Sequence, residues 1–216
     1  SLKIPWQLPS GTRSEALDEE VLQALFDTGC RLITYAPESA SEETLRQIKK
    51  KIKIDRLVKS IRTANKIGHT TKVNIVIGFP DDTLASILKS AWFAVKMAIY
   101  GSEDCTFTKF SPYPGSELYR RLRDENKIPP PDDDYIRSLA GFMDFTKTES
   151  YCNQVNGRVL TFLAFAMHGV FYSIAYLIHP KRILRAIGNL TKKRFKPMNV
   201  LEQRLYDVFV REKLKP

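Results

Sequence analysis

The sequence predicts an α/β fold with a parallel sheet, followed by a helical extension at the C-terminus. Two observations predict this fold. Over residues 1–128, short apolar runs typical of strands alternate with stripes of apolar residues at helical spacing. Each connection between strands is also long enough to hold a helix, as the crossover between parallel strands requires. The pattern is compatible with an open sheet or with a partial βα barrel.

Each element is predicted from its own pattern. Strands are expected at 4–8, 31–37, 72–79 and 105–112, and the third has the most continuous β-branched run, Val73 to Ile77. Helices are expected at 17–28, 41–50, 55–67, 85–100 and 116–126, several of them closed by glycine. Ser39 followed by Glu42 predicts a capping box before the second helix.

The remaining chain divides into two further segments. Three prolines at 129–131 end the alternating pattern, so we assign residues 129–156 to a linker with a short helix near 135–143. Residues 157–216 are assigned to an apolar helix and a basic helical tail. The predicted organisation is therefore 1–128, 129–156 and 157–216.

The net charge of +10 is not spread evenly. Residues 1–150 contain 22 basic and 21 acidic side chains, whereas residues 151–216 contain 12 and 3. The nearly neutral first part argues against electrostatic binding of nucleic acid by the body of the protein. Cys30, Cys105 and Cys152 are too far apart for a zinc ribbon or a redox C-x-x-C motif, and no metal ligands are predicted in this chain.

Candidate functional residues follow the predicted strands, because the carboxyl ends of parallel strands share one edge of the sheet. Glu38, at one strand exit, is expected either to bind an ammonium group or a ribose diol, or to charge the next helix start. Arg13 is expected to bind an anionic group or to form a surface ion pair.

Two later strand ends carry further candidates. Gly78–Pro80 allows a close approach of the backbone to a ligand, or simply ends the strand. Asn74 is a buried anchor or a ligand contact, and Tyr113 is an exposed aromatic in a turn. Neither a G-x-G-x-x-G motif nor a P-loop occurs, so the usual nucleotide-binding glycines are missing.

Taken together, four of these segments resemble the later half of a radical S-adenosylmethionine enzyme barrel. They are 12–13, 38–41, 74–80 and 110–119, and they lie in the order and spacing of that family's motifs. The resemblance covers about residues 4–128. It is greatest to the group that carries a cobalamin-binding domain ahead of the barrel.

The resemblance implies S-adenosylmethionine and a [4Fe-4S] cluster as cofactors, with cobalamin as a further one. It implies that the cluster cleaves S-adenosylmethionine to a 5′-deoxyadenosyl radical, and that the substrate is a small molecule. The expected cofactor-binding residues are Arg13, Glu38, Ser39, Asn74, Gly78, Phe79, Pro80, Phe110 and Tyr113.

The sequence departs from the family's pattern at several points. The C-x-x-x-C-x-x-C cluster motif is absent, and the three distant cysteines do not replace it. Ala40 stands where the family commonly has glycine, and Asp81-Asp82-Thr83 replaces Gly-Glu-Thr. We therefore expect this chain to be the C-terminal piece of a longer enzyme, with its catalytic residues unassigned and no activity on its own.

The run 160–178 contains no charged residue and is nearly long enough to cross a bilayer. Its polar residues Thr161, His168, Tyr172 and Tyr176 share one helical face. Three placements remain open, in the membrane interface, across the membrane, or packed on the barrel, and the stripe favours the first. The basic residues that follow predict binding to an anionic membrane surface through residues 157–196.

This pattern suggests a cytoplasmic protein on the inner face of a membrane, with a lipid-like substrate. Two other functions remain open: a membrane-associated binding or scaffold protein with a degenerate barrel, and an RNA-modifying relative. The basic tail has little aromatic interleaving for base stacking, so nucleic acid is not the expected partner.

Overall fold

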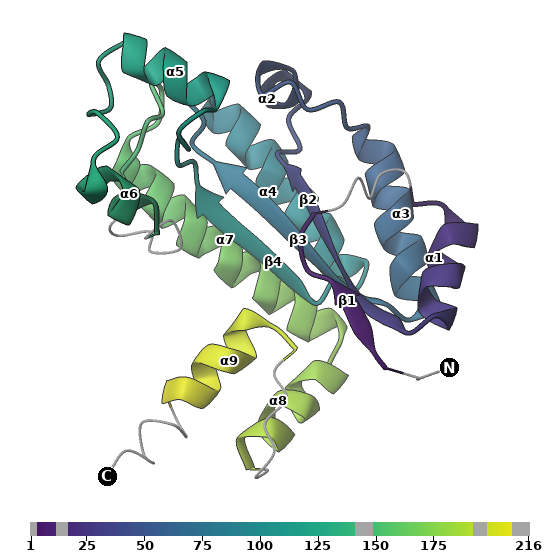
Figure 1. Ribbon diagram of the computed structural model, residues 1–216. Helices are drawn as coiled ribbons and strands as arrows, with labels where there is room; N and C mark the ends of the chain where they lie inside the picture. The colour runs from purple at the N-terminus through teal and green to yellow at the C-terminus, as the bar shows by residue number, and fades with distance from the viewer. Residues whose placement is uncertain (1–3, 12–16, 141–148, 192–197, 209–216) are drawn as a thin grey trace.

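The computed structural model describes residues 4–11, 17–140, 149–191 and 198–208. Within them a single parallel sheet has the strand order β1-β2-β3-β4, which is also the order along the chain (Figure 1). The strands are β1 (Trp6–Leu8), β2 (Cys30–Glu38), β3 (Thr70–Ile77) and β4 (Asp104–Lys109). The predicted α/β alternation with a parallel sheet is confirmed.

The helices lie where the apolar stripes predicted them, with ends shifted by a few residues. The first five are α1 (Glu19–Asp27), α2 (Glu42–Gln47), α3 (Ile54–Ile67), α4 (Leu84–Ile99) and α5 (Glu117–Asp124). The others are α6 (Asp133–Ala140), α7 (Gly157–Ile178), α8 (Lys181–Thr191) and α9 (Val200–Tyr206).

The predicted capping box at Ser39 is wrong. Ser41 is the N-cap of α2, and its hydroxyl accepts a hydrogen bond from the Thr44 amide at 3.4 Å. A capping box is present instead at the start of α4, between Thr83 and Ser86. Ser39 cannot cap α2, because its hydroxyl is already bonded inside the protein, as described below.

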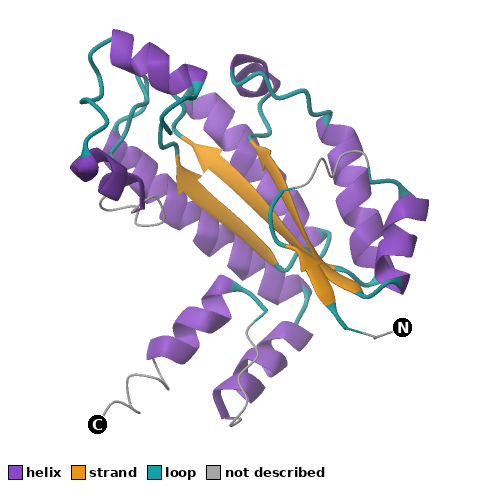
Figure 2. Ribbon diagram, viewed as in Figure 1, coloured by secondary structure: helices purple, strands orange, loops and turns teal. Residues whose placement is uncertain are grey.

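The helices α1, α3 and α4 cover one face of the sheet and leave the other face open (Figures 1 and 2). Strand β3 shows this asymmetry, because Val73, Ile75 and Ile77 are buried while Asn74 and Val76 are partly exposed. A sheet whose strands follow the order of the chain, with helices on one face only, has the topology of a βα barrel. A doubly wound sheet reverses its strand order and has helices on both faces. The tertiary structure thus favours the partial barrel over the open sheet.

Helix α7 packs along the free edge of β4 and against α4. Its buried stripe enters the main core, and comprises Leu160, Ala164, Met167, Phe171 and Ala175. This stripe repeats every three or four residues, the spacing of one helical face. The helix also protects β4, whose outer edge would otherwise present unpaired backbone groups.

The polar stripe of α7 contacts the fold. His168 Nε2 accepts the amide of Phe107 on β4 at 3.3 Å, and the Tyr172 hydroxyl donates to Asp104 Oδ1 at 2.6 Å. Burial raises the pKa of Tyr172, and the nearby Asp104 carboxylate raises it further. The polar stripe therefore packs on the barrel, and the placement of α7 relative to a membrane stays a prediction.

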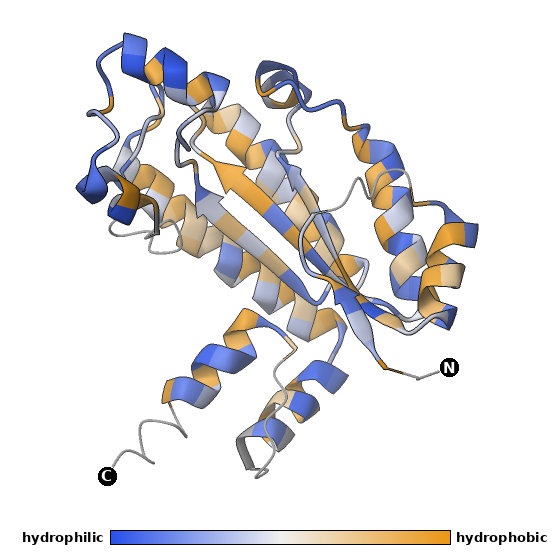
Figure 3. Cartoon of the chain, in the orientation of Figure 1, coloured by the Kyte–Doolittle hydropathy of each residue, from blue (hydrophilic) through white to orange (hydrophobic). Residues whose placement is uncertain are grey.

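Most of the exposed side chains of α7 are apolar, and Figure 3 shows hydrophobic colours along much of this helix. Phe162 is 69% exposed and Leu177 is 78% exposed. Among the described residues, Gly157–Ile178 is the one helix that is long and apolar enough to span a membrane by length and composition, and 28% of its most apolar 18-residue window is buried. A core helix passes the same test, so length and composition alone do not place it in a bilayer.

Part of the basic tail is bonded within the protein. Arg182 donates to the carbonyl oxygens of Gly101 at 2.8 Å and Ser102 at 3.0 Å, and lies 3.3 Å from Glu103. Arg185 forms ion pairs with Glu103 and with Glu202. These two cations attach the tail to the start of β4. The predicted basic cluster at 192–196 lies outside the described residues.

Candidate functional site

A cavity of about 650 Å³ lies on the open face of the sheet, at the carboxyl ends of β2, β3 and β4. Parallel βα folds place their ligands at this end of the strands. Five of the nine predicted cofactor-binding residues line the cavity: Glu38, Asn74, Phe79, Phe110 and Tyr113. The other lining residues are Ile48, Lys50, Val76, Thr106, Thr108, Lys109 and Ser111.

Glu38 is held in an unusual backbone conformation at the end of β2. Its φ of +66° lies in the left-handed region, and the pairing of β2 with β3 is irregular between Tyr35 and Glu38. A residue with a side chain costs about 1–2 kcal/mol there. Such strain is concentrated at functional sites, where the surrounding structure maintains it.

Lys50 holds the Glu38 side chain. Its ammonium group donates to Glu38 Oε1 at 2.8 Å and to the carbonyl oxygen of Ala36 at 2.6 Å. Both charged side chains keep about 30% exposure, so the ion pair borders the cavity and is not sealed in the core. The cavity therefore has a carboxylate and an ammonium group side by side at the exit of β2.

The floor of the cavity carries polar groups from the two central strands. Asn74 lies beside Thr106 in the register of β3 with β4, and Thr108 follows on the same face. The side-chain amide of Asn74 has no hydrogen-bond partner among the described residues of the chain. An amide that both donates and accepts is thus available to a ligand.

The wall of the cavity is aromatic. The rings of Phe79 and Phe110 lie 5.0 Å apart with an interplanar angle of 39°. Both belong to a small second core formed with α5 and α6, which fixes their positions. Tyr113 is 53% exposed at the rim. This arrangement offers an apolar surface to one flat ligand group.

Asp82 supports the aromatic wall from behind. Its carboxylate accepts the amides of Gly78 at 2.9 Å and Phe79 at 3.0 Å through one oxygen. The other oxygen accepts the hydroxyls of Thr44 at 2.8 Å and Ser86 at 2.9 Å. With four hydrogen bonds and 3% exposure, Asp82 positions the loop after β3. In the sequence, Asp82 stands out only as a departure from a family pattern.

Three predicted site residues do not line the cavity. The Ser39 hydroxyl is buried, 3.3 Å from the Ser90 hydroxyl, and accepts the Ser41 amide at 3.1 Å. Gly78 has a φ of +81° and lies against Leu160, while the Pro80 carbonyl accepts an amide of the following linker. These residues shape the loops around the cavity. Arg13 lies outside the described residues.

Several lining residues were missed from the sequence. Thr106 and Thr108 alternate with buried residues along β4, so their shared face was readable from strand periodicity. Lys50 carried no such signal, because it reaches Glu38 from the connection between α2 and α3. Lys109 is the last residue of β4, and nothing in the sequence around it indicates that it is buried.

Ligands for an iron–sulfur cluster are not assembled in this chain. Cys30 and Cys105 are buried on different strands, and burial raises the pKa of both thiols. No group of three His, Cys, Asp or Glu side chains in the described residues is arranged to hold a metal ion. A cluster needs closely placed thiolates, so these residues do not fit it.

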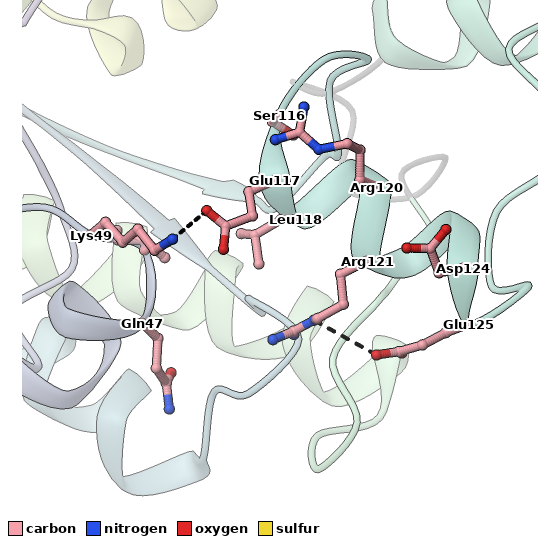
Figure 4. Close-up of a pocket in the computed structure, with 10 residues that line it drawn as sticks. Gln47, Lys49, Ser116, Glu117, Leu118, Arg120, Arg121, Asp124 and Glu125 are labelled. Atoms are coloured by element: carbon pink, nitrogen blue, oxygen red, sulfur yellow. Dashed lines mark hydrogen bonds and ion pairs between the residues drawn. The ribbon is translucent and has the colours of Figure 1, made fainter.

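A second cavity of about 670 Å³ adjoins the first beside Ile48, between the end of α2 and α5 (Figure 4). Its charges pair with one another: Lys49 lies 2.6 Å from Glu117, and Arg121 lies 3.7 Å from Glu125. Because these groups satisfy each other, we place the candidate site in the cavity at the strand ends.

The structure is a parallel βα protein with a candidate site at the strand ends, and comparison with known proteins shows which of them it resembles. Residues 8–93 match the family model described as the radical SAM superfamily. The resemblance predicted from the sequence is confirmed. The matched region runs from β1 into α4 and contains the exits of β2 and β3.

Two curated proteins are similar to the chain. One is an uncharacterised methyltransferase from Pyrococcus horikoshii, 33% identical over 118 residues, which are 55% of this chain and 25% of that protein. The other is the cytidylyl-2-hydroxyethylphosphonate methyltransferase of Streptomyces wedmorensis, 27% identical over 139 residues, 61% of this chain and 26% of that protein. The chain thus spans about a quarter of the length of these relatives.

Two solved structures are also similar. Methylornithine synthase (PylB) matches with a TM-score of 0.45 and 18% identity, over 76% of this chain and 46% of that one. Coproporphyrinogen III oxidase (HemN) from Escherichia coli matches with a TM-score of 0.45 and 15% identity, over 62% and 31%.

Proposed function

We propose that this chain forms the S-adenosylmethionine-binding part of a radical S-adenosylmethionine enzyme, and that methyl transfer is the reaction of the whole protein. The observation that carries the proposal is the cavity at the strand ends. It combines the strained Glu38, the unpartnered Asn74 amide and the Phe79–Phe110 pair. The methyltransferase names of both curated relatives support the reaction class.

The cavity residues match the chemistry of S-adenosylmethionine. The Glu38 carboxylate would hold the ammonium group of the amino-acid portion, and the Lys50 ammonium group is placed for its carboxylate. Asn74 would bind the ribose hydroxyls, while Phe79, Phe110 and Tyr113 would contact the adenine. When bound, this cofactor supplies a methyl group or a 5′-deoxyadenosyl radical.

The [4Fe-4S] cluster is expected from the family, and cobalamin rests on the resemblance alone. Since the chain's thiols do not fit a cluster, we propose that this chain alone binds S-adenosylmethionine without cleaving it. A small molecule is proposed as its substrate, and a lipid-like one only because of the apolar C-terminal helix.

Calorimetric titration of S-adenosylmethionine tests the binding role of the cavity. We expect Glu38→Gln to weaken binding by about ten- to a hundredfold, because a hydrogen bond to a charged group is lost. The matched control is Glu43→Gln on the exposed side of α2, which should change affinity by less than about twofold. Equal affinities for wild type and Glu38→Gln would contradict the proposal.

The same titration tests the alternative of a scaffold protein with a degenerate barrel. Such a protein would show no binding that depends on Glu38. A protein with the cluster ligands supplied, reconstituted anaerobically with iron and sulfide, should release 5′-deoxyadenosine, whereas this chain alone should release none.

Association with the cytoplasmic face of a membrane is retained as a second proposal. The exposed apolar face of α7, with Phe162 and Leu177, supports it. Flotation with anionic liposomes should be lost in Phe162→Ser/Leu177→Ser and retained in the control Val21→Ser on α1. Equal flotation of both variants would contradict it. An RNA gel shift over a salt series addresses the RNA-modifying alternative.

A further inference from the structure

A third concave surface lies beside the candidate site, and its lining is basic. This basic cavity, of about 750 Å³, is formed by the end of α2, the connection to α3 and the first turn of α3. Its lining residues are Glu42, Leu45, Arg46, Lys49, Lys50, Lys51, Ile52, Lys53, Ile54, Asp55 and Arg56. Six of these are cations and two are acids.

Half of the cations in the basic cavity are already engaged. Arg46, Lys49 and Lys50 each pair with a glutamate. The other three, Lys51, Lys53 and Arg56, are exposed and form no ion pair with a described residue. Like charges held on one concave wall repel one another and focus a positive potential, and a multiply charged anion relieves that repulsion.

The basic cavity shares a wall with the candidate site. Lys50 lines both cavities, and its ammonium group reaches Glu38 at the exit of β2. A ligand with its anionic group in the basic cavity would extend past Lys50 to bring its reacting carbon to the strand ends. The apolar face of α7 is well separated from this cavity, because α2 and α3 lie toward the β1–β2 edge of the sheet and α7 lies along β4 (Figure 1).

A single-stranded RNA is a poorer match to this surface than a small anion. Residues 46–56 contain no aromatic side chain, and nonspecific single-strand binding combines cations with aromatic stacking platforms. A phosphate or phosphonate group needs only the cations.

We propose that the basic cavity binds the phosphate or phosphonate group of a small-molecule substrate whose reacting carbon enters the candidate site. The proposal rests on the proposed function and specifies its substrate class. It assigns a recognition role to Lys51 and Lys53, which lie outside the cavity that would hold S-adenosylmethionine.

Calorimetric titration with inorganic pyrophosphate tests this assignment on the full chain at low and moderate salt. We expect Lys51→Gln/Lys53→Gln to weaken pyrophosphate binding by about tenfold. The matched control is Lys59→Gln/Lys66→Gln, which removes the same charge from α3 outside the basic cavity, and it should stay within about twofold. Circular dichroism confirms that both variants fold.

Titration of S-adenosylmethionine on the same samples separates this inference from the proposed function. Both variants should bind S-adenosylmethionine like the wild type.

An equal loss of pyrophosphate binding in the two variants, or no pyrophosphate binding by a wild type that binds S-adenosylmethionine, overturns the basic cavity as a phosphate site. Tighter binding of a 20-nucleotide RNA that depends on Lys59 and Lys66 also overturns it. Pyrophosphate binding that depends on Lys51 and Lys53 without S-adenosylmethionine binding supports the site but refutes the proposed function.

Discussion

Replacing Asp82 with alanine removes the buried carboxylate behind the aromatic wall. The side chain is 3% exposed and accepts four hydrogen bonds, two from backbone amides and two from hydroxyls. A hydrogen bond to a charged group is worth about 1.5–3 kcal/mol, but bonds in one network do not add. We expect Asp82→Ala to lower the free energy of unfolding by about 3–5 kcal/mol, as for a broken buried charge network.

Two further variants show whether the hydrogen bonds are responsible. In Asp82→Asn, the remaining carbonyl oxygen can accept the amides of Gly78 and Phe79, while the new amide group donates to the two hydroxyls. We expect a loss of about 1–2 kcal/mol. The neighbouring Asp81 is partly exposed, 2.8 Å from Arg121, so Asp81→Ala should cost less than about 1 kcal/mol.

Urea unfolding followed by circular dichroism measures all three variants at neutral pH. The expected order of destabilisation is Asp82→Ala, then Asp82→Asn, then Asp81→Ala. Equal midpoints for Asp82→Ala and Asp81→Ala would refute the supporting role of Asp82.

Two other predictions use the same unfolding assay. Gly78→Ala should destabilise by about 2–4 kcal/mol, since φ is +81° and a Cβ would lie 2.7 Å from Leu160 Cδ1. Gly115→Ala has a φ of +90° but open space, so it should cost only about 1 kcal/mol, and equal losses would contradict the packing argument. His168 has a pKa lowered by burial, so its neutral form is favoured in the folded state and stability should fall as pH drops below about 6.5. His168→Gln, which can still accept the Phe107 amide, should flatten this fall, whereas an unchanged pH profile would show that another group causes it.

Local patterns were sufficient for much of the fold and part of the site. The spacing of apolar residues predicted which segments are strands and which are helices. When one face of an element is buried, its apolar residues recur with the period of that element. Glu38, Asn74 and Tyr113 were recognised for a similar reason. Each follows or lies near the end of a parallel strand, and those ends share an edge of the sheet whatever the order of the strands.

The loops around the cavity were not predictable in the same way. Ser39 and Glu38 are adjacent, yet Glu38 faces the cavity while Ser39 bonds Ser90, 51 residues further along the chain. Neighbouring residues of a strand already face opposite sides, but neither the left-handed backbone at Glu38 nor the distant partner Ser90 is indicated by the residue types. The same holds for Asp82, whose partners Thr44 and Ser86 come from two different helices.

The sequence by itself determined the βα alternation, the resemblance to a radical S-adenosylmethionine barrel and the shared face of the polar residues of α7. Only the tertiary structure decided what that face meets. Helical spacing shows that His168 and Tyr172 point the same way, but a membrane interface and the edge of a strand both offer polar partners. The edge of β4 supplies the Phe107 amide and the Asp104 carboxylate, and a buried polar group must find such a partner to be stable.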